Sequence, residues 1–146
     1  MVKIGTDTWE VTSLFNILVV EDDKNTRKLM GAILCENGFS PFLAADGNAA
    51  LRVLDQQQID LIVLDVMLPN MDGYQLTEEL RGAGFSLPIL MVTARQTPGD
   101  KKQGFLAGTD DYMIKPVDEE EMILRIKALL RRASIAAEHK LTIGKV

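Results

Sequence analysis

Carboxylate, hydroxyl and ammonium side chains follow four short apolar runs of this 146-residue sequence. Crowded carboxylates repel one another unless a proton or a cation neutralises them, and hard oxygen ligands are those that Mg²⁺ prefers. At such a site Asp65 would be a nucleophile toward phosphorus, and Thr93 and Lys115 would neutralise charge on the transferred phosphoryl group. The residues concerned are Glu21, Asp22, Asp23, Asp65, Thr93 and Lys115.

This chemistry requires elements that bring the residues together. Short β-branched runs alternate along the chain with segments of helical periodicity, which predicts five strands, each followed by a helix. Strands joined through helices run parallel and are covered on both faces. We therefore expect a three-layer, doubly wound α/β domain. The predicted strands are 17–20, 41–45, 61–64, 89–93 and 112–114.

Ligands of such sheets bind beyond the carboxyl ends of the strands, which is where all six residues lie. Taken singly, each has a simpler explanation. Acidic residues after strands are often helix caps, and Asp23 is predicted to be one, while a lysine before a proline is usually solvated. Their joint occurrence at the same end of separate strands favours a site.

Composition limits the class of protein. The content of 47% hydrophobic and 25% charged residues is typical of a globular domain, and the net charge of −5 argues against nucleic-acid binding by this domain alone. No apolar run approaches the ~20 residues of a membrane helix, and no signal pattern is present, so we expect a cytoplasmic protein without a membrane association. The single cysteine, Cys35, excludes an internal disulfide and is expected to be buried.

Over about residues 16–133 the sequence resembles the receiver domain of two-component response regulators. The resemblance implies a flavodoxin-like sheet with strand order 2-1-3-4-5 and a phosphoacceptor regulatory domain rather than an enzyme. By this resemblance, Asp65 accepts a phosphoryl group from a sensor histidine kinase or a small phosphodonor. Glu21 and Asp22 would hold Mg²⁺ together with Asp65 and the backbone carbonyl of Met67. The motifs that carry the resemblance are 19–23, 64–69, 71–73, 93–94 and 115–116.

The same resemblance assigns roles around the phosphoryl group. Thr93 would donate a hydrogen bond to it and Lys115 would form an ion pair with it, and the family's peptide before Pro116 is usually cis. Tyr112 occupies the position of the family's aromatic switch, so Thr93 would move toward the phosphate and Tyr112 would turn inward behind it. The alternative for Tyr112 is an ordinary half-buried strand aromatic.

Residues 108–112 and 125–132 resemble receivers of the OmpR/PhoB type, which precede a winged-helix DNA-binding domain. The resemblance implies that phosphorylation drives homodimerisation through the fourth helix, fifth strand and fifth helix. Leu106 departs from the acidic residue expected to face Lys127. The alternative is a solvated face with ion pairs of little energetic value. The cross-subunit ion pairs implied are Lys101 with Glu121 and Asp111 with Arg125.

We expect three parts in the chain: an N-terminal extension over 1–15, the receiver over 16–133, and a linker with the start of a missing effector domain over 134–146. Residues 141–144 have the pattern of a strand. The chain would then be a fragment, and DNA would be contacted only through the missing domain. The kinase, the stimulus and the promoters do not follow from the sequence.

Three other functions are compatible with part of this pattern of residues or with the same topology. A phosphatase of the haloacid dehalogenase type also combines Asp, Thr, Lys and Mg²⁺, but it needs a second aspartate as acid and base where this chain has Met67. A flavodoxin-like cofactor binder needs small and hydroxyl residues after the first strand, where Glu21, Asp22 and Asp23 would repel a phosphate. A receiver that signals without phosphorylation would not need Asp65, Thr93 and Lys115. The sequence favours the phosphoacceptor switch.

Overall fold

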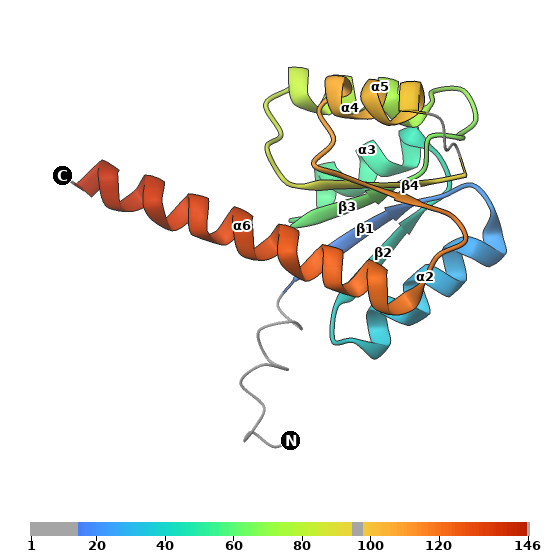
Figure 1. The fold of residues 1–146 in the computed structure, drawn as a ribbon, viewed down its shortest axis with the longest axis horizontal. Helices are drawn as coiled ribbons and strands as arrows, with labels where there is room; N and C mark the ends of the chain where they lie inside the picture. The colour runs from blue at the N-terminus through green and yellow to red at the C-terminus, as the bar shows by residue number, and fades with distance from the viewer. Residues whose placement is uncertain (1–14, 95–97, 146) are drawn as a thin grey trace.

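The computed structural model describes residues 15–94 and 98–145. Its centre is a five-stranded parallel sheet in the order β2-β1-β3-β4-β5, and helices cover both faces (Figure 1). The predicted three-layer, doubly wound fold is therefore confirmed. The strands are β1 (Asn16–Val20), β2 (Ser40–Ala44), β3 (Leu61–Leu64), β4 (Ile89–Thr93) and β5 (Asp111–Ile114), and the helices are α2 (Lys24–Glu36), α3 (Gly47–Gln56), α4 (Gly73–Gly82), α5 (Pro98–Ala107) and α6 (Glu119–Lys145).

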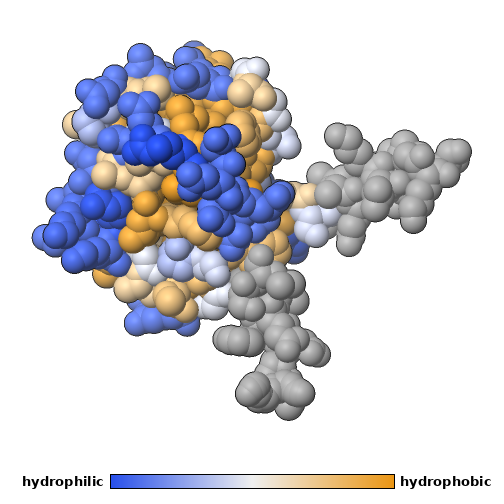
Figure 2. All heavy atoms as spheres, turned by 180° about the vertical axis from the view of Figure 1, so that it is seen from behind, coloured by the Kyte–Doolittle hydropathy of each residue, from blue (hydrophilic) through white to orange (hydrophobic). Residues whose placement is uncertain are grey.

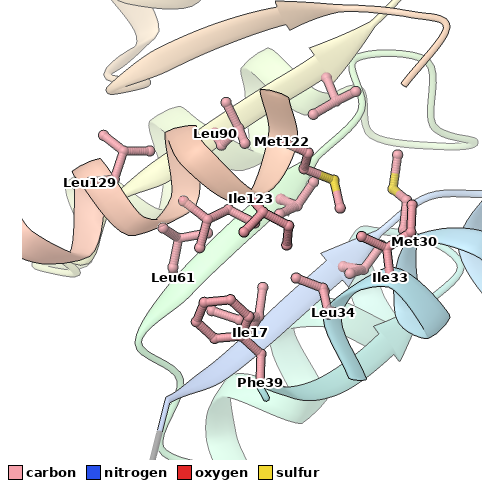
Figure 3. Packing of buried hydrophobic residues seen from close by; sticks show 14 of the residues in the cluster. Ile17, Met30, Ile33, Leu34, Phe39, Leu61, Leu90, Met122, Ile123 and Leu129 are labelled. Atoms are coloured by element: carbon pink, nitrogen blue, oxygen red, sulfur yellow. The ribbon is translucent and has the colours of Figure 1, made fainter. Parts of the chain in front are cut away.

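Two apolar clusters hold the layers together, one on each face of the sheet. Successive strand residues point to opposite faces, so Ile17 and Val19 of β1 pack in one cluster and Leu18 and Val20 in the other. The first cluster includes the inner faces of α2 and α6, whose side chains point toward one another over β1 and β3 (Figure 3). The second includes residues of α3, α4 and α5.

Aspartates at the carboxyl edge of the sheet begin three of the helices. Asp23, Asp46 and Asp72 each accept a hydrogen bond from the backbone N–H three residues further on. At α4 the N–H of Asp72 donates a hydrogen bond to Oε1 of Gln75, which completes a capping box. These bonds satisfy N–H groups that a helix start leaves unpaired, and the predicted cap at Asp23 is confirmed.

The structure corrects the expectation that Cys35, which lies on α2, is buried. Cys35 is exposed rather than buried, and Leu29, which shares the apolar pattern of this helix, is 53% exposed. The inward face consists of Met30, Ile33 and Leu34. Leu29 and Cys35 each lie one residue, or about 100° of rotation, beyond that face, so they turn toward solvent. Apolar side chains also lie among hydrophilic ones on the surface opposite to the view of Figure 1 (Figure 2).

The last helix is longer than expected. It runs from Glu119 to Lys145, so residues 141–144, which have the pattern of a strand, are helical. A short apolar run fits either structure by periodicity alone, and here the run continues a helix already formed. The final turns extend beyond the sheet (Figure 1). In the described residues no helix is both long and apolar enough to span a membrane.

Candidate functional site

The carboxyl ends of β1 and β3 bring three carboxylates together. Val20 pairs with Leu64 in the parallel ladder, so the residues that follow these two are neighbours across the sheet edge. Carboxylate oxygens of Glu21, Asp22 and Asp65 lie within 4.8 Å of one another. Glu21 is 1% exposed and Asp65 is 4% exposed, whereas Asp22 faces solvent. The group therefore has a buried side and an open side.

Lys115 places its ammonium group between the two buried carboxylates. Its Nζ lies 2.7 Å from Oε1 of Glu21 and 2.7 Å from Oδ2 of Asp65. The peptide that joins Lys115 to Pro116 is cis, as the resemblance implies. The lysine comes from the end of β5, so it reaches the site from a strand far along the chain.

Burial and neighbouring charges shift the pKa values of Glu21 and Lys115. Burial raises the pKa of the Glu21 carboxyl, and the neighbouring charge of Asp65 adds to that rise, although hydrogen bonds from Lys115 and from the N–H of Asp23 oppose it. Burial by itself would lower the pKa of Lys115, but hydrogen bonds to Asp65 and Glu21 outweigh it and the pKa is raised. Lys115 is therefore a fixed positive charge at neutral pH.

Thr93 and Tyr112 lie on the same face of the sheet. Thr93 ends β4 and is fully buried, and it pairs with Ile114 in the ladder. Tyr112, two residues before Ile114, points to the same face and is 4% exposed, within the cluster that contains α3, α4 and α5. The tyrosine ring in this structure is therefore turned inward.

Loop residues border the site. Glu21, Asp22, Asp65 and Lys115 line an open cleft together with Met67. The N–H of Met67 donates a hydrogen bond of 3.1 Å to Oδ1 of Asp65, and its side chain is exposed at the rim.

Gly73 has a role at the site that the sequence did not reveal. A Cβ at this position would lie 2.4 Å from the carbonyl oxygen of Asp65 and 2.9 Å from Cα of Val66. Real Cβ atoms do not approach that closely, so only glycine lets the start of α4 pack on the backbone that follows β3. The signal was present in the sequence as a glycine after a turn-rich loop, but it indicated a turn and not a close approach.

The donor set fits Mg²⁺. Three carboxylates offer hard oxygen ligands, and the exposed position of Asp22 leaves room for water, which Mg²⁺ usually retains. Because the formal charge of these three carboxylates exceeds that of Lys115, a further cation would reduce their mutual repulsion.

The charged residues predicted at a dimer interface lie elsewhere, on α5, β5 and α6. Nη1 of Arg125 lies 2.9 Å from Oδ2 of Asp111, and its Nε lies 2.9 Å from Oε2 of Glu121. Asp111 and Arg125 are thus paired within one chain. Lys101 is exposed on α5, with Nζ 6.0 Å from the centre of the Tyr112 ring.

Known proteins are similar to this chain in sequence and in fold. The sequence model of the response regulator receiver domain family matches residues 17–127. The heme response regulator HssR of Staphylococcus aureus (strain MRSA252) is 39% identical over 129 residues, which make up 88% of this chain and 57% of that protein. The chain thus spans somewhat more than half the length of the curated relatives that it matches.

Solved receiver domains superpose on most of the chain. The receiver domain of the Francisella response regulator 1452 is 33% identical, with a TM-score of 0.77, over 81% of this chain and 98% of that one. The receiver domain of sensor histidine kinase PA1611 from Pseudomonas aeruginosa PAO1 is 34% identical, with a TM-score of 0.73, over 80% and 97% of the two chains. That structure has a magnesium ion coordinated in its active-site cleft.

Proposed function

Since the chain belongs to the response regulator receiver domain family, we propose that Asp65 is the residue that accepts the phosphoryl group of this signalling switch. A receiver domain is a regulatory phosphoacceptor that works with a histidine kinase. The observation that carries the assignment is the position of Asp65. It lies at the carboxyl edge of the sheet, in an open cleft, 2.7 Å from a lysine ammonium group.

In the proposed reaction a carboxylate oxygen of Asp65 attacks phosphorus. An O–P bond forms while the P–N bond of a phosphohistidine, or the P–O bond to acetate in acetyl phosphate, breaks, and the leaving group takes the electron pair. Lys115, which now contacts Asp65 directly, would pair with the charge of the arriving phosphoryl group. Thr93 would donate its hydroxyl hydrogen to a phosphoryl oxygen.

Glu21, Asp22 and Asp65 would hold Mg²⁺, with the backbone carbonyl of Met67 as a further ligand. When bound, the ion would neutralise charge on the transferring phosphoryl oxygens. Two observations support this proposal: the convergence of the three carboxylates and the magnesium ion in the similar cleft of the PA1611 receiver domain.

Thr93 and Tyr112 would transmit the phosphorylation to the surface. Both side chains lie on the same face of neighbouring strands, so a shift of Thr93 toward the phosphoryl group would change the space available to Tyr112. Gly104 of α5 lies against the tyrosine ring. The signal would therefore pass from β4 through Tyr112 to α5.

The output would be a homodimer formed through α5, β5 and α6. Phe105 and Leu124 are exposed apolar side chains of α5 and α6, which we call the α5–α6 apolar pair, and the proposed interface would also include Lys101, Asp111, Glu121 and Arg125. In the dimer, Asp111 and Arg125 would exchange a partner within the chain for one across the interface. Such an exchange costs little because the same charged groups are paired before and after it.

The proposed arrangement of the whole protein follows the OmpR/PhoB type. Residues 1–15 would precede the receiver, 16–133 would form it, and 134–146 would lead to a DNA-binding effector domain that regulates transcription. In α6 the buried Leu130 is followed by four exposed residues, 131–134, which supports a domain boundary close to residue 133. Any contact with DNA would come from the effector domain, since the present chain carries a net charge of −5.

Intact mass spectrometry after treatment with acetyl phosphate tests the assignment of Asp65. We expect wild-type protein to gain one phosphoryl group (~80 Da) in the presence of Mg²⁺ and Asp65→Ala to gain none, because the nucleophile is missing. Asp55→Ala is the matched control, since Asp55 is an exposed aspartate on α3, outside the site. An adduct of equal yield on Asp65→Ala would show that another residue accepts the phosphoryl group.

A further inference from the structure

Arg27 contacts the backbone of both residues that begin the acidic motif. It lies in the first turn of α2, and its Nη1 donates a hydrogen bond of 2.8 Å to the carbonyl oxygen of Glu21 and one of 3.2 Å to the carbonyl oxygen of Asp22. The side chain is partly buried. One end of one guanidinium group thus bridges two consecutive peptide units just after β1.

These two peptide units decide where the carboxylates point. Consecutive residues of an extended strand point to opposite faces, yet oxygens of Glu21 and Asp22 come within 4.8 Å of one another and of Asp65. The backbone must therefore turn between Glu21 and Asp22. A donor that holds both carbonyl oxygens fixes their relative orientation, and with it the directions of the two side chains.

Glu21 and Asp22 differ in what else holds them. The Glu21 side chain is buried, bonded to Lys115, and accepts a bond from the N–H of Asp23. Asp22 is exposed, so packing does not restrict its side chain. The direction of the Asp22 carboxylate therefore depends more strongly on its backbone, which Arg27 holds.

We propose that Arg27 is a positioning residue for metal binding, which holds the Glu21–Asp22 backbone so that both carboxylates face the ion. This role rests on the proposed function of the site. Its positive charge would in addition reduce the repulsion among the three anions. The hydrogen bonds and the charge make separate predictions, because lysine keeps the charge but its side chain is one bond shorter than the path to Nη1, so its ammonium group would not reach both carbonyl oxygens from position 27.

The test measures the affinity for Mn²⁺, a probe for the Mg²⁺ site, by electron paramagnetic resonance of the free ion, with Mg²⁺ as competitor. The variants are Arg27→Met and Arg27→Lys. Lys28→Ala is the matched control, because it removes one positive charge from an exposed neighbour on the same helix. Urea unfolding of each variant in EDTA checks that the domain is folded where binding is measured.

We expect Arg27→Met to raise the Kd for Mn²⁺ about tenfold, the lower end of the range for groups that orient metal ligands. Arg27→Lys should be intermediate and Lys28→Ala should stay within about twofold, since screening reduces the effect of an exposed charge. In phosphorylation by acetyl phosphate, Arg27→Met should need more Mg²⁺ for half-maximal rate while the rate at saturating Mg²⁺ stays close to that of wild type. A residue that merely supported the fold would not separate these two quantities.

Wild-type affinity for Mn²⁺ in folded Arg27→Met would overturn the proposal. Full affinity in Arg27→Lys would also overturn it, because the charge of the side chain, and not its hydrogen bonds, would then account for the affinity. A fall in the saturating rate without a change in the half-saturating Mg²⁺ concentration would also overturn it. Failure of the wild-type protein to bind Mn²⁺ would instead refute the proposed metal site itself, so the two failures are distinguishable.

Discussion

At the scale of single residues, the central feature is one ammonium group shared by two buried carboxylates. Lys115 contacts Glu21 and Asp65 at equal distances of 2.7 Å, and its side chain is 22% exposed while theirs are almost covered. Buried charges without a partner are strongly unfavourable. The lysine therefore stabilises the folded state, besides its proposed role toward a phosphoryl group.

Lys115→Ala should reduce the stability of the domain in EDTA. We expect the free energy of unfolding to fall by about 2 kcal/mol, below the usual cost of breaking a buried ion pair because Lys115 keeps some contact with water. Mg²⁺ should raise the melting temperature of Lys115→Ala more than that of wild type, since the ion would replace the missing positive charge. Urea unfolding and thermal unfolding, with and without Mg²⁺, measure both effects.

Lys127→Ala provides the control, because Lys127 is an exposed lysine of α6. Its loss should change the free energy of unfolding by less than about 0.5 kcal/mol. Equal destabilisation by the two substitutions would contradict the importance of the shared ammonium group.

At the scale of elements, the contact between α5 and β5 depends on a glycine. A Cβ on Gly104 would lie 3.3 Å from Cδ2 and Cε2 of Tyr112 and 3.3 Å from Cγ2 of Thr109. A side chain at position 104 would therefore require the tyrosine ring or the helix to shift by a few tenths of an ångström. This contact is where the proposed switch residue meets the proposed dimer face.

Gly104→Ala and Gly82→Ala form a matched pair of substitutions. Both glycines lie in helices, but a Cβ on Gly82 meets nothing within 4 Å. Alanine at position 82 should raise the free energy of unfolding by up to about 1 kcal/mol through helix propensity. Alanine at position 104 should leave the free energy of unfolding unchanged or lower it by about 1 kcal/mol, because the Tyr112 ring must shift to make room for the Cβ.

Urea unfolding gives the two stabilities, and the NMR signals of the Tyr112 ring report its displacement. We expect altered ring signals in Gly104→Ala only. If Gly104→Ala were as stabilising as Gly82→Ala and left the ring unchanged, α5 would not be in tight contact with Tyr112.

At the scale of the whole molecule, the sheet has two open edges with different surroundings. At the β5 edge, Phe105 and Leu124, the α5–α6 apolar pair, are exposed, and Leu124 lines a groove together with Asp111, Glu121 and Arg125. At the β2 edge, Leu43 is also exposed, at 43% against 61% for Leu124. Exposed apolar side chains thus occur at both edges of the sheet. The proposed dimer uses only the β5 edge.

Phosphorylation should convert the monomer into a dimer that Leu124→Glu disrupts. A carboxylate in the apolar part of the interface would lose its hydration without gaining a partner. Leu43→Glu, at the other edge, should leave dimerisation unchanged. Sedimentation velocity with acetyl phosphate and Mg²⁺ measures the state of each protein, and intact mass confirms that both variants are phosphorylated to the wild-type extent.

A phosphorylated wild-type chain that stayed monomeric at high concentration would contradict the proposed dimer. Disruption by Leu43→Glu, with no effect of Leu124→Glu, would place the interface at the β2 edge instead.

Local patterns in the sequence were sufficient to predict the five strands, the cap at Asp23 and the edge of the sheet at which the buried carboxylates and Lys115 meet. Strand and helix periodicity is a property of neighbouring residues, and parallel connection through helices brings all strand ends of one kind to the same edge. The convergence of Glu21, Asp65 and Lys115 at that edge follows from these two facts.

Only the tertiary structure decided which groups are buried and which pairs touch. The ion pair between Glu21 and Lys115 spans 94 positions of the chain, and neither residue's neighbours in sequence reveal it. The exposure of Cys35, the close approach at Gly73 and the bridge made by Arg27 depend likewise on how far each helix is rotated and how near it lies to the sheet. Rotation and distance are set by the packing of whole elements, so a local pattern does not contain them.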